Sequence, residues 1–365
     1  MNVAQVISFF EEIAPIQYQE TYDNSGLQVG NVQDEVHGAL LTLDVTEPVL
    51  DEAIAKGCNL IIAHHPLIFS GLKNLTGRNY VQRIVQKAIK NDINIFAVHT
   101  NLDNMRNGVN ERMASKLALV NTQILAPTNS NQWKLQTYVP TAQAMALKEA
   151  LFAAGAGHIG QYSECSFSQM GTGTFKADEQ SQPFIGQAGG PREQLTEEKI
   201  EVIVAAHLKN KVEIALIEAH PYEEVAFDWL ALGNQNKEIG AGLVGDLPSA
   251  MSEEDFLQML KTNMKAQAIR HTALLGKPIK RVALCGGSGS FLLHKAIGAQ
   301  ADVFVSADFK YHQFFDAENK IVIADIGHYE TEQFTVEIFD ALLKKKNITF
   351  AVLLSTLDTN PIKYL

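Results

Sequence analysis

Short apolar runs that alternate with helical patterns constrain the fold of this chain more than any other feature. Between residues 38 and 127, apolar runs such as GALLTLDVT, NLIIAHH and INIFAVHT are separated by stretches such as PVLDEAIAKG and YVQRIVQKAIK. The alternation returns after residue 250 in KRVALCGG, ADVFVSADF and KIVIADIGH, followed by an expected helix from Glu330 to about Lys346 and a last strand, TFAVLLST. This alternation is typical of βαβ units. We predict an α/β protein whose large domain has two βα-rich halves with mainly parallel sheets.

The stretch between these halves has a different order of expected strands and helices. It opens with a strand, KLQTYVP, and a helix, AQAMALKEALFAAG, and closes with KIEVIVAA, KVEIALIEAH and VAFDWLAL. Two βα units with strands between and after them predict an inserted ferredoxin-like α+β domain. Residues 177–196 are rich in Gly, Pro, Gln and charge, which indicates a surface loop. We expect a discontinuous large domain, residues 1–129 and 237–365, and an inserted domain, residues 130–236.

Composition excludes several classes of protein. A hydrophobic fraction of 46% with 19% charged residues indicates a folded chain. The net charge of -11 argues against binding to nucleic acid. Three widely spaced cysteines without a CxxC pair indicate neither disulfides nor a thiolate zinc site, so we expect a cytoplasmic protein. No apolar run approaches the ~20 residues of a membrane helix, and we expect no membrane partner.

Polar clusters follow several predicted strands at the edge where open α/β sheets bind ligands. His64 and His65 close NLIIAHHP, where Pro66 turns the chain so that both imidazoles can face one site. His328 and Glu332, in DIGHYETE, are four residues apart and project together from one helix face. The alternatives are a chance surface pair for HH and a favourable helix N-terminus for the acidic residues of DIGHYETE.

A further cluster, AVHTNLDN, follows the next strand and contains His99 and Asp103. An aspartate near an asparagine can instead only close a turn. Together, three imidazoles and two carboxylates can hold two divalent ions, with one carboxylate bridging and positions open for water. We therefore predict a site for two zinc, iron or manganese ions that is formed by His64, His65, Asp103, His328 and Glu332.

Other polar groups fall near the same strand ends. DNSGLQVG is a turn that contacts either a ligand or only its own backbone. CGGSGS, residues 285–290, is either a phosphate cradle or a plain tight turn, and no Walker lysine follows it. We assign substrate binding to Asn24, Gly286, Gly287, Ser288, Lys310 and His312. We assign proton transfer or other catalytic roles to Asp44, His99, Asp308 and Glu332.

Seven segments, taken in order, closely resemble the signatures of the Nif-three-like family, the GTP cyclohydrolase I type 2 homologues: DNSGLQVG, TLDVT, IIAHHPLIF, HTNLD, CGGSGS, ADVFVSADFKYH and DIGHYETE. HPYEEVAFDW, residues 220–229, resembles a signature of the PII- and CutA-like insert of longer bacterial members, with Val225 where proline is usual. The resemblance implies a dinuclear metal centre on the five residues above, with Glu332 bridging. It also implies a ring-shaped homo-hexamer with the metal sites facing an internal cavity.

These observations support two functional hypotheses. The first is a dinuclear metal-dependent hydrolase that activates water against a nucleotide or a similar cyclic or phosphorylated small molecule. The second is a non-catalytic metal-binding regulator or scaffold, whose inserted domain senses a small ligand. Metal-dependent turnover distinguishes them. A ring would also suit nucleic acid, but the net charge of -11 does not.

Overall fold

The computed structural model describes residues 1–129, 132–346 and 348–365. It separates into two compact units, one formed by Met1–Pro127 with Lys237–Leu365 and the other by Thr128–Asn236. The first boundary between the two units therefore follows Pro127, whereas the sequence pattern placed it after residue 129. Mainly parallel sheets in the large unit confirm the expected α/β class.

The first sheet of the large unit has five strands in the order β1-β4-β3-β2-β15. In that order they are β1 (Gly26–Val29), β4 (Asn94–Ala97), β3 (Leu60–Ala63), β2 (Gly38–Thr42) and β15 (Ala351–Leu354). All are parallel except β1, which pairs antiparallel with β4 at one edge. Part of DNSGLQVG, expected to be only a turn, therefore forms this edge strand. The last strand follows the second half in sequence, but it pairs with β2 of the first.

Helices cover both faces of the first sheet because alternate residues of its strands point to opposite sides. Leu41 and Ile62 share a buried cluster with α1 (Val3–Ile13) and α11 (Thr335–Lys345). Leu40, Ile61 and Ile95 pack on the other side against α2 (Glu47–Ala55) and α3 (Tyr80–Lys90). Helices α1, α2 and α3 begin at side chains that accept a hydrogen bond from a first-turn amide: Asn2, Thr46 and Asn79.

The second sheet has six strands in the order β11-β14-β13-β12-β10-β5. In that order they are β11 (Arg270–His271), β14 (Val322–Asp325), β13 (Val303–Ala307), β12 (Ile279–Ser288), β10 (Gln235–Met251) and β5 (Val120–Asn129). The three strands β12, β13 and β14 are parallel, whereas β10 pairs antiparallel with β12 and β11 pairs antiparallel with β14. Further helices of this half are α5 (Val109–Lys116), α8 (Glu253–Asn263) and α9 (Leu293–Gly298).

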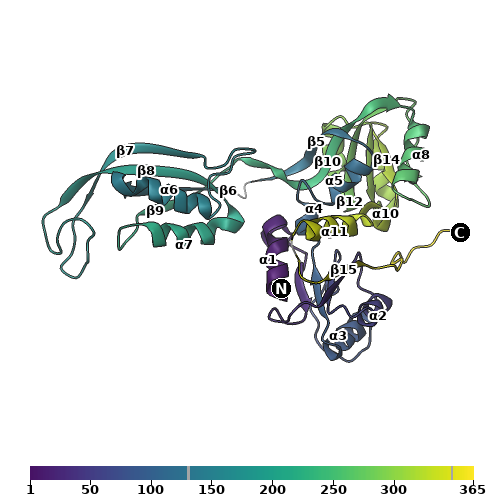
Figure 1. Ribbon diagram of the computed structural model, residues 1–365. Coiled ribbons are helices and arrows are strands. Elements are labelled where there is room, and N and C mark those ends of the chain that lie inside the picture. The colour runs from purple at the N-terminus through teal and green to yellow at the C-terminus, as the bar shows by residue number, and fades with distance from the viewer. Residues whose placement is uncertain (130–131, 347) are drawn as a thin grey trace. The chain divides into compact units, whose positions relative to one another are not determined.

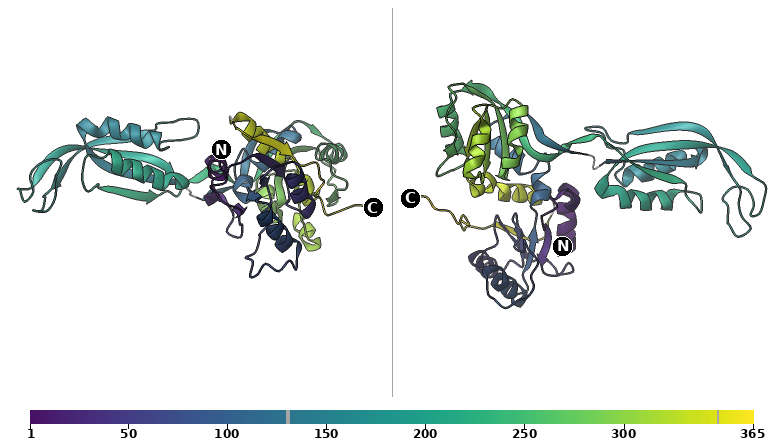
Figure 2. Two further views of the ribbon diagram at one scale, coloured as in Figure 1. Left: turned by 60° about the horizontal axis from the view of Figure 1, so that its bottom comes forward. Right: turned by 180° about the vertical axis from the view of Figure 1, so that it is seen from behind.

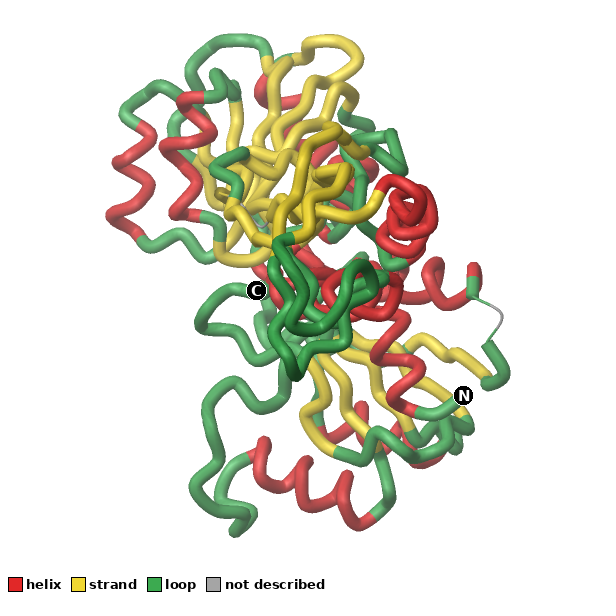
Figure 3. The backbone as a smooth tube through the Cα atoms, turned by 90° about the vertical axis from the view of Figure 1, so that its left-hand side faces the viewer, coloured by secondary structure: helices red, strands yellow, loops and turns green. Residues whose placement is uncertain are grey.

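Short helices lie between the two sheets. The single helix expected from Glu330 to Lys346 is two helices, α10 (His328–Glu332) and α11, and α4 (Thr100–Asp103) follows β4. Figure 1 shows these helices between the sheets of the large unit, and Figure 3 shows helices in the same region from another side. The polar loops that follow the parallel strands of both sheets therefore meet in one region. The 3-10 helices are η1 (Ile16–Tyr18), η2 (Thr141–Gln143), η3 (Ala206–Leu208), η4 (Ser290–Leu292) and η5 (Tyr311–Ala317).

The inserted unit has the strand and helix order of a ferredoxin-like domain. Its elements are β6 (Gln132–Pro140), α6 (Ala144–Ala153), β7 (Ser166–Phe175), β8 (Glu193–Ala205), α7 (Lys209–Ala219) and β9 (Phe227–Ala231). The sheet order is β7-β8-β6-β9, and every pair is antiparallel. Both helices lie on one face of this sheet (Figure 2). Because β8 begins at Glu193, the loop expected at residues 177–196 ends earlier than predicted.

Among the described residues, no helix combines the length and the apolar character needed to cross a membrane.

Candidate metal centre

The predicted ligands come from three segments that follow strands of the two sheets. His64 and His65 directly follow β3, and Asp103 ends α4. Because both histidines lie beyond the last strand residue, the alternation of the strand no longer separates them, and their ring centroids are 5.0 Å apart. His328 and Glu332 begin and end α10. The structure thus brings all five residues together, in overlapping groups whose ligand atoms lie within 4.8 Å of one another.

The three histidines share one hydrogen-bonding pattern. In each, ring atom Nδ1 faces an oxygen that can only accept, so the Nδ1 atom carries the proton and donates. When such a ring is neutral, its Nε2 atom is left with a lone pair that can bind a metal ion. The acceptors are the Val98 carbonyl for His64 (2.9 Å), the Asp44 carboxylate for His65 (2.7 Å) and the Asp308 carboxylate for His328 (2.6 Å).

The Nε2 atoms converge on one buried carboxylate. Oxygen Oε2 of Glu332 lies 2.8 Å from Nε2 of His65, 3.1 Å from that of His328 and 3.8 Å from that of His64. The Glu332 side chain is only 3% exposed. A carboxylate shared by three imidazoles has the chemistry of a bridging ligand between two metal ions.

Two buried atoms of this cluster have no hydrogen-bond partner: Nε2 of His64 and Oδ1 of Asp103. They are 3.5 Å apart. Burial lowers the pKa of His64 to about 3, so its ring is neutral and Nε2 presents a lone pair to the carboxyl group. Burial, and then the charge of Glu332, raise the pKa of Asp103. A cation between the two atoms would satisfy both, so this donor set fits a divalent metal ion.

The other two histidines have the opposite electrostatic environment. Burial alone would lower the pKa of His65, but the carboxylates of Asp44 and Glu332 outweigh it and raise the pKa to about 10. Glu332 and Asp308 likewise overcome the burial of His328 and raise its pKa to about 11. Burial would raise the pKa of Glu332, yet the two histidines hold it well below its usual value. Without a metal, protons therefore supply the positive charge that this cluster requires.

The glycine-rich loop contacts residues of the candidate metal centre. The amides of Gly286, Gly287 and Gly289 donate to side chains of Asn110 (2.9 Å), Thr331 (2.9 Å) and Ser306 (3.0 Å), respectively. Those amides are thus already used, and the predicted phosphate cradle is not supported at Gly286 and Gly287. A Cβ at Gly287 would instead overlap Oε1 of Glu332, and the φ of +60° also favours glycine. The glycine leaves room for the carboxylate.

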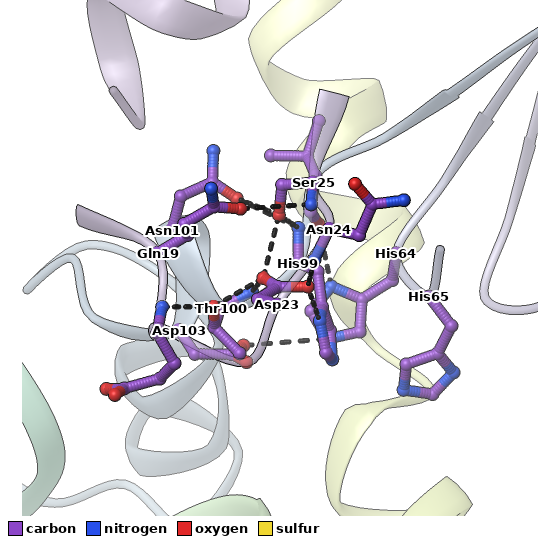
Figure 4. A network of polar contacts seen from close by, with 12 residues as sticks. Gln19, Asp23, Asn24, Ser25, His64, His65, His99, Thr100, Asn101 and Asp103 are labelled. Carbon is purple, nitrogen blue, oxygen red and sulfur yellow. Dashed lines mark hydrogen bonds and ion pairs between the residues drawn. The ribbon is translucent and has the colours of Figure 1, made fainter. Parts of the chain in front are cut away.

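Asp23 organises a second polar network beside the histidines (Figure 4). Its carboxylate accepts from Nδ1 of His99 (2.8 Å), from the amide and hydroxyl of Thr100, and from the hydroxyl of Ser25 (2.8 Å). The His99 ring lies 5.2 Å from that of His64 and 5.4 Å from that of His65, measured between centroids. His99 therefore lies beside the candidate ligands, and its catalytic role stays a prediction. Asp23 was not among the predicted site residues, although its place in DNSGLQVG was the available signal.

The remaining predicted residues have other surroundings. Asp44 and Asp308 contact the centre only through His65 and His328, so their geometry is that of positioning groups. Asn24 donates to the Ile68 carbonyl (2.6 Å) and so holds the loop after His65. Neither Lys310 nor His312 lines the two cavities beside the centre, whereas Ser288 does. Substrate roles for these residues stay predictions.

Two cavities open at the candidate metal centre. The smaller, about 240 Å³, is lined by His65, His99, Asp103, His328 and Glu332. Three aromatic side chains at its edge, Tyr22, Phe69 and Phe291, are between 52% and 66% exposed. The larger, about 970 Å³, is bounded by His65, His328 and the loop from Leu67 to Asn74. Small molecules can therefore reach the centre from more than one side.

Comparisons with known proteins extend over the whole chain. A model of the family described as Duf34/NIF3 (NGG1p interacting factor 3) matches residues 1–361. A Halalkalibacterium halodurans protein named GTP cyclohydrolase 1 type 2 homolog is 40% identical over 369 residues, covering 100% of this chain and 99% of the relative. A Bacillus subtilis protein of the same name is 36% identical over 370 residues, with the same coverage.

Solved structures agree with these relatives. A Bacillus cereus protein related to NIF3 is 38% identical, with a TM-score of 0.88 over 100% of this chain and 99% of its own. A Staphylococcus aureus protein is 31% identical, with a TM-score of 0.79 and the same coverage. The similarity therefore includes the inserted unit as well as the large one.

Proposed function

The chain belongs to the Duf34/NIF3 family, and from this premise and the geometry of its histidine and carboxylate cluster we propose that it is a dinuclear metal-dependent hydrolase. His64, Asp103 and Glu332 would hold one ion. His65, His328 and Glu332 would hold the other, with Glu332 shared. Two bound zinc, iron or manganese ions lower the pKa of water and stabilise negative charge on an attacked group.

The observation that carries this proposal is the shared orientation of three imidazoles. Each donates its Nδ1 proton to an acceptor and aims Nε2 at the same carboxylate. A purely structural buried histidine would use both nitrogens in hydrogen bonds, because an unpartnered buried nitrogen costs about 1–3 kcal/mol. The Nε2 atom of His64 is unpartnered and fully buried. Metal binding accounts for that cost.

The residues around the centre either orient the ligands or face the cavity where a substrate would bind. Asp44 and Asp308 hold two histidine rings in one tautomer and orientation. His99 faces the smaller cavity with its Nδ1 held by Asp23, which leaves its Nε2 to exchange a proton with a bound substrate. Burial would raise the pKa of Asp23, but hydrogen bonds from His99 and Thr100 hold it low, so it remains a carboxylate. The substrate class that we propose is a nucleotide or a similar cyclic or phosphorylated small molecule.

Metal analysis of variants tests the ligand assignment. His65→Ala and Glu332→Ala are expected to fold and to lose bound metal, which elemental analysis of the purified proteins measures. His294→Ala removes an exposed histidine on α9 and is the matched control. Undiminished metal in both site variants would show that the assignment is wrong.

Turnover tests the hydrolase itself. Protein loaded separately with zinc, iron or manganese should be assayed against nucleotides, cyclic amides and phosphoesters, with the Glu332→Ala protein as the inactive control. A metal-dependent product that this variant does not form is expected. Metal bound without any product would favour the second function, a metal-binding regulator.

One observation favours that regulatory function specifically. The inserted unit contains its own cavity of about 670 Å³, lined by Tyr138, Phe175, Phe184 and Tyr222 among others. A small ligand there would give this unit a sensing role that the metal centre does not need. Binding of a metabolite to the Glu332→Ala protein would support it. Assembly as a homo-hexamer and a cytoplasmic location stay predictions, the first of which light scattering tests.

A further inference from the structure

The C-terminal segment, residues 355–365, crosses from the first sheet towards the metal centre; we call it the C-terminal strap. It leaves β15 and is anchored at its start to Glu52 of α2. The Ser355 hydroxyl donates to this carboxylate (2.5 Å), as do the Thr356 amide (3.0 Å) and hydroxyl (2.9 Å). Figures 1 and 2 show the strap as an extended chain beyond β15. Two of these three hydrogen bonds do not involve the Thr356 hydroxyl.

Farther along, the strap contacts a residue that orients a metal ligand. The Thr359 hydroxyl donates to Oδ2 of Asp44 (2.6 Å). The other oxygen of the same carboxylate, Oδ1, accepts from Nδ1 of His65 (2.7 Å), and Nε2 of that ring lies 2.8 Å from Glu332. Thr359 also lines the larger cavity together with His65. A continuous chain of hydrogen bonds thus leads from the strap to the metal centre.

The next residue of the strap contacts the helix that carries the other ligands. Asn360 is 7% exposed, and its amide donates to Oε1 of Glu330 (3.1 Å). Glu330 is a buried residue of α10, between His328 and Glu332. The strap therefore contacts groups from both halves of the large unit that meet at the centre.

We propose that Thr359 is a positioning residue of the metal centre, which acts on the ligand His65 through Asp44. A carboxylate held at only one oxygen can rotate about its Cβ–Cγ bond, and the imidazole that depends on it then loses orientation. The Thr359 hydroxyl holds the second oxygen and so fixes the carboxylate plane. Partners one shell beyond a metal ligand typically contribute about 10- to 100-fold in metal affinity. Because Thr359 is one step more remote, we expect the lower end of that range. The inference rests on the proposed metal site.

The test compares two threonines of the same strap. Thr359→Val removes the hydroxyl at nearly constant volume, and Thr356→Val makes the same change at the Glu52 anchor, away from the ligands. The affinity of the full-length protein for Mn²⁺ and for Zn²⁺ is measured by competition with a chromophoric chelator, alongside the Tm of the metal-free proteins. We expect about 10-fold weaker binding by Thr359→Val, an affinity within about 2-fold of wild type for Thr356→Val, and recovery in Thr359→Ser.

A double-mutant cycle tests the route through Asp44. If Thr359 acts only on this carboxylate, adding Thr359→Val to Asp44→Ala lowers the affinity no further. Additive losses would overturn the proposed route, and wild-type affinity of Thr359→Val would overturn the inference. A lowered Tm with unchanged affinity would show a merely structural contact and would overturn it too. Failure of the wild-type protein to bind either ion would refute the proposed function, and the inference with it.

Discussion

Replacing Asp103 with asparagine should make the metal-free protein more stable while abolishing its response to metal. Oδ1 of Asp103 and Nε2 of His64 face each other at 3.5 Å without a hydrogen-bond partner. An asparagine amide can donate to that nitrogen and satisfies the pair without any cation. Oδ1 of Asp103, which the metal-free fold leaves unsatisfied, is thus also the atom that metal binding requires.

The expected gain in stability follows from the cost of unsatisfied buried groups, about 1–3 kcal/mol. For a domain of this size, each kcal/mol corresponds to a change in Tm of about 2–4 °C, so Asp103→Asn should raise the Tm of the metal-free protein by roughly 2–12 °C. The wild-type protein should instead gain about 2.7 kcal/mol when the free metal concentration is 100 times its Kd. The variant should gain far less from the same metal.

Differential scanning calorimetry in chelator and in excess Mn²⁺ measures both effects. Asp316→Asn, at an exposed aspartate of η5, is the matched control because it makes the same charge change away from the centre. A metal-free Asp103→Asn protein that is less stable than wild type would refute the reasoning. So would a variant that metal stabilises as much as wild type.

Three further perturbations act on the same centre. Below their raised pKa values of about 10 and 11, His65 and His328 carry protons that a metal ion must displace, so metal affinity should rise with pH. Calorimetry in buffers of different ionisation enthalpy should detect this proton release near neutral pH. Absence of proton release would contradict the assignment. The same raised pKa values stabilise the metal-free fold, fully below about pH 6.5, and this contribution is lost as the pH rises through about 10–11. The Tm of the metal-free protein across that pH range measures the loss. Asp308→Ala should weaken metal binding about 10- to 100-fold by freeing His328, as chelator competition measures, and unchanged affinity would count against this role. Gly287→Ala should displace the Glu332 carboxylate and reduce bound metal in elemental analysis, whereas Gly298→Ala, where no atom lies within 4 Å of the added Cβ, should not.

The ligand cluster could be predicted because its signals are local. His64 and His65 close an apolar run before a proline, and His328 and Glu332 have helical spacing. Parallel strands of one sheet bring their carboxyl ends to one edge, so His64, His65 and Asp103 can be expected to meet, whereas His328 and Glu332 follow a strand of the other sheet. The same reasoning predicts the α/β class and the ferredoxin-like insert, since both depend on the periodicity of apolar residues.

The contacts that give the centre its chemistry carry no such signal. The acceptor for His64 is the backbone carbonyl of Val98, which any residue type could supply. The loop CGGSGS resembles an anion cradle in sequence, yet a distant asparagine, Asn110, and Thr331 take up its amides. Thr359 lies in a short polar tail, and only the pairing of β15 with β2 brings it to Asp44. Tertiary pairing decides these contacts, and single-sequence patterns do not encode it.

The central claim is that five side chains hold two cations with Glu332 between them. Anomalous scattering from crystals grown with Mn²⁺ or Zn²⁺ measures this directly, because it locates each metal ion and its ligands. The account predicts two peaks, one beside His64 and Asp103 and the other beside His65 and His328. A metal bound elsewhere, or crystals saturated with metal that show no peak within bonding reach of Glu332, would contradict it.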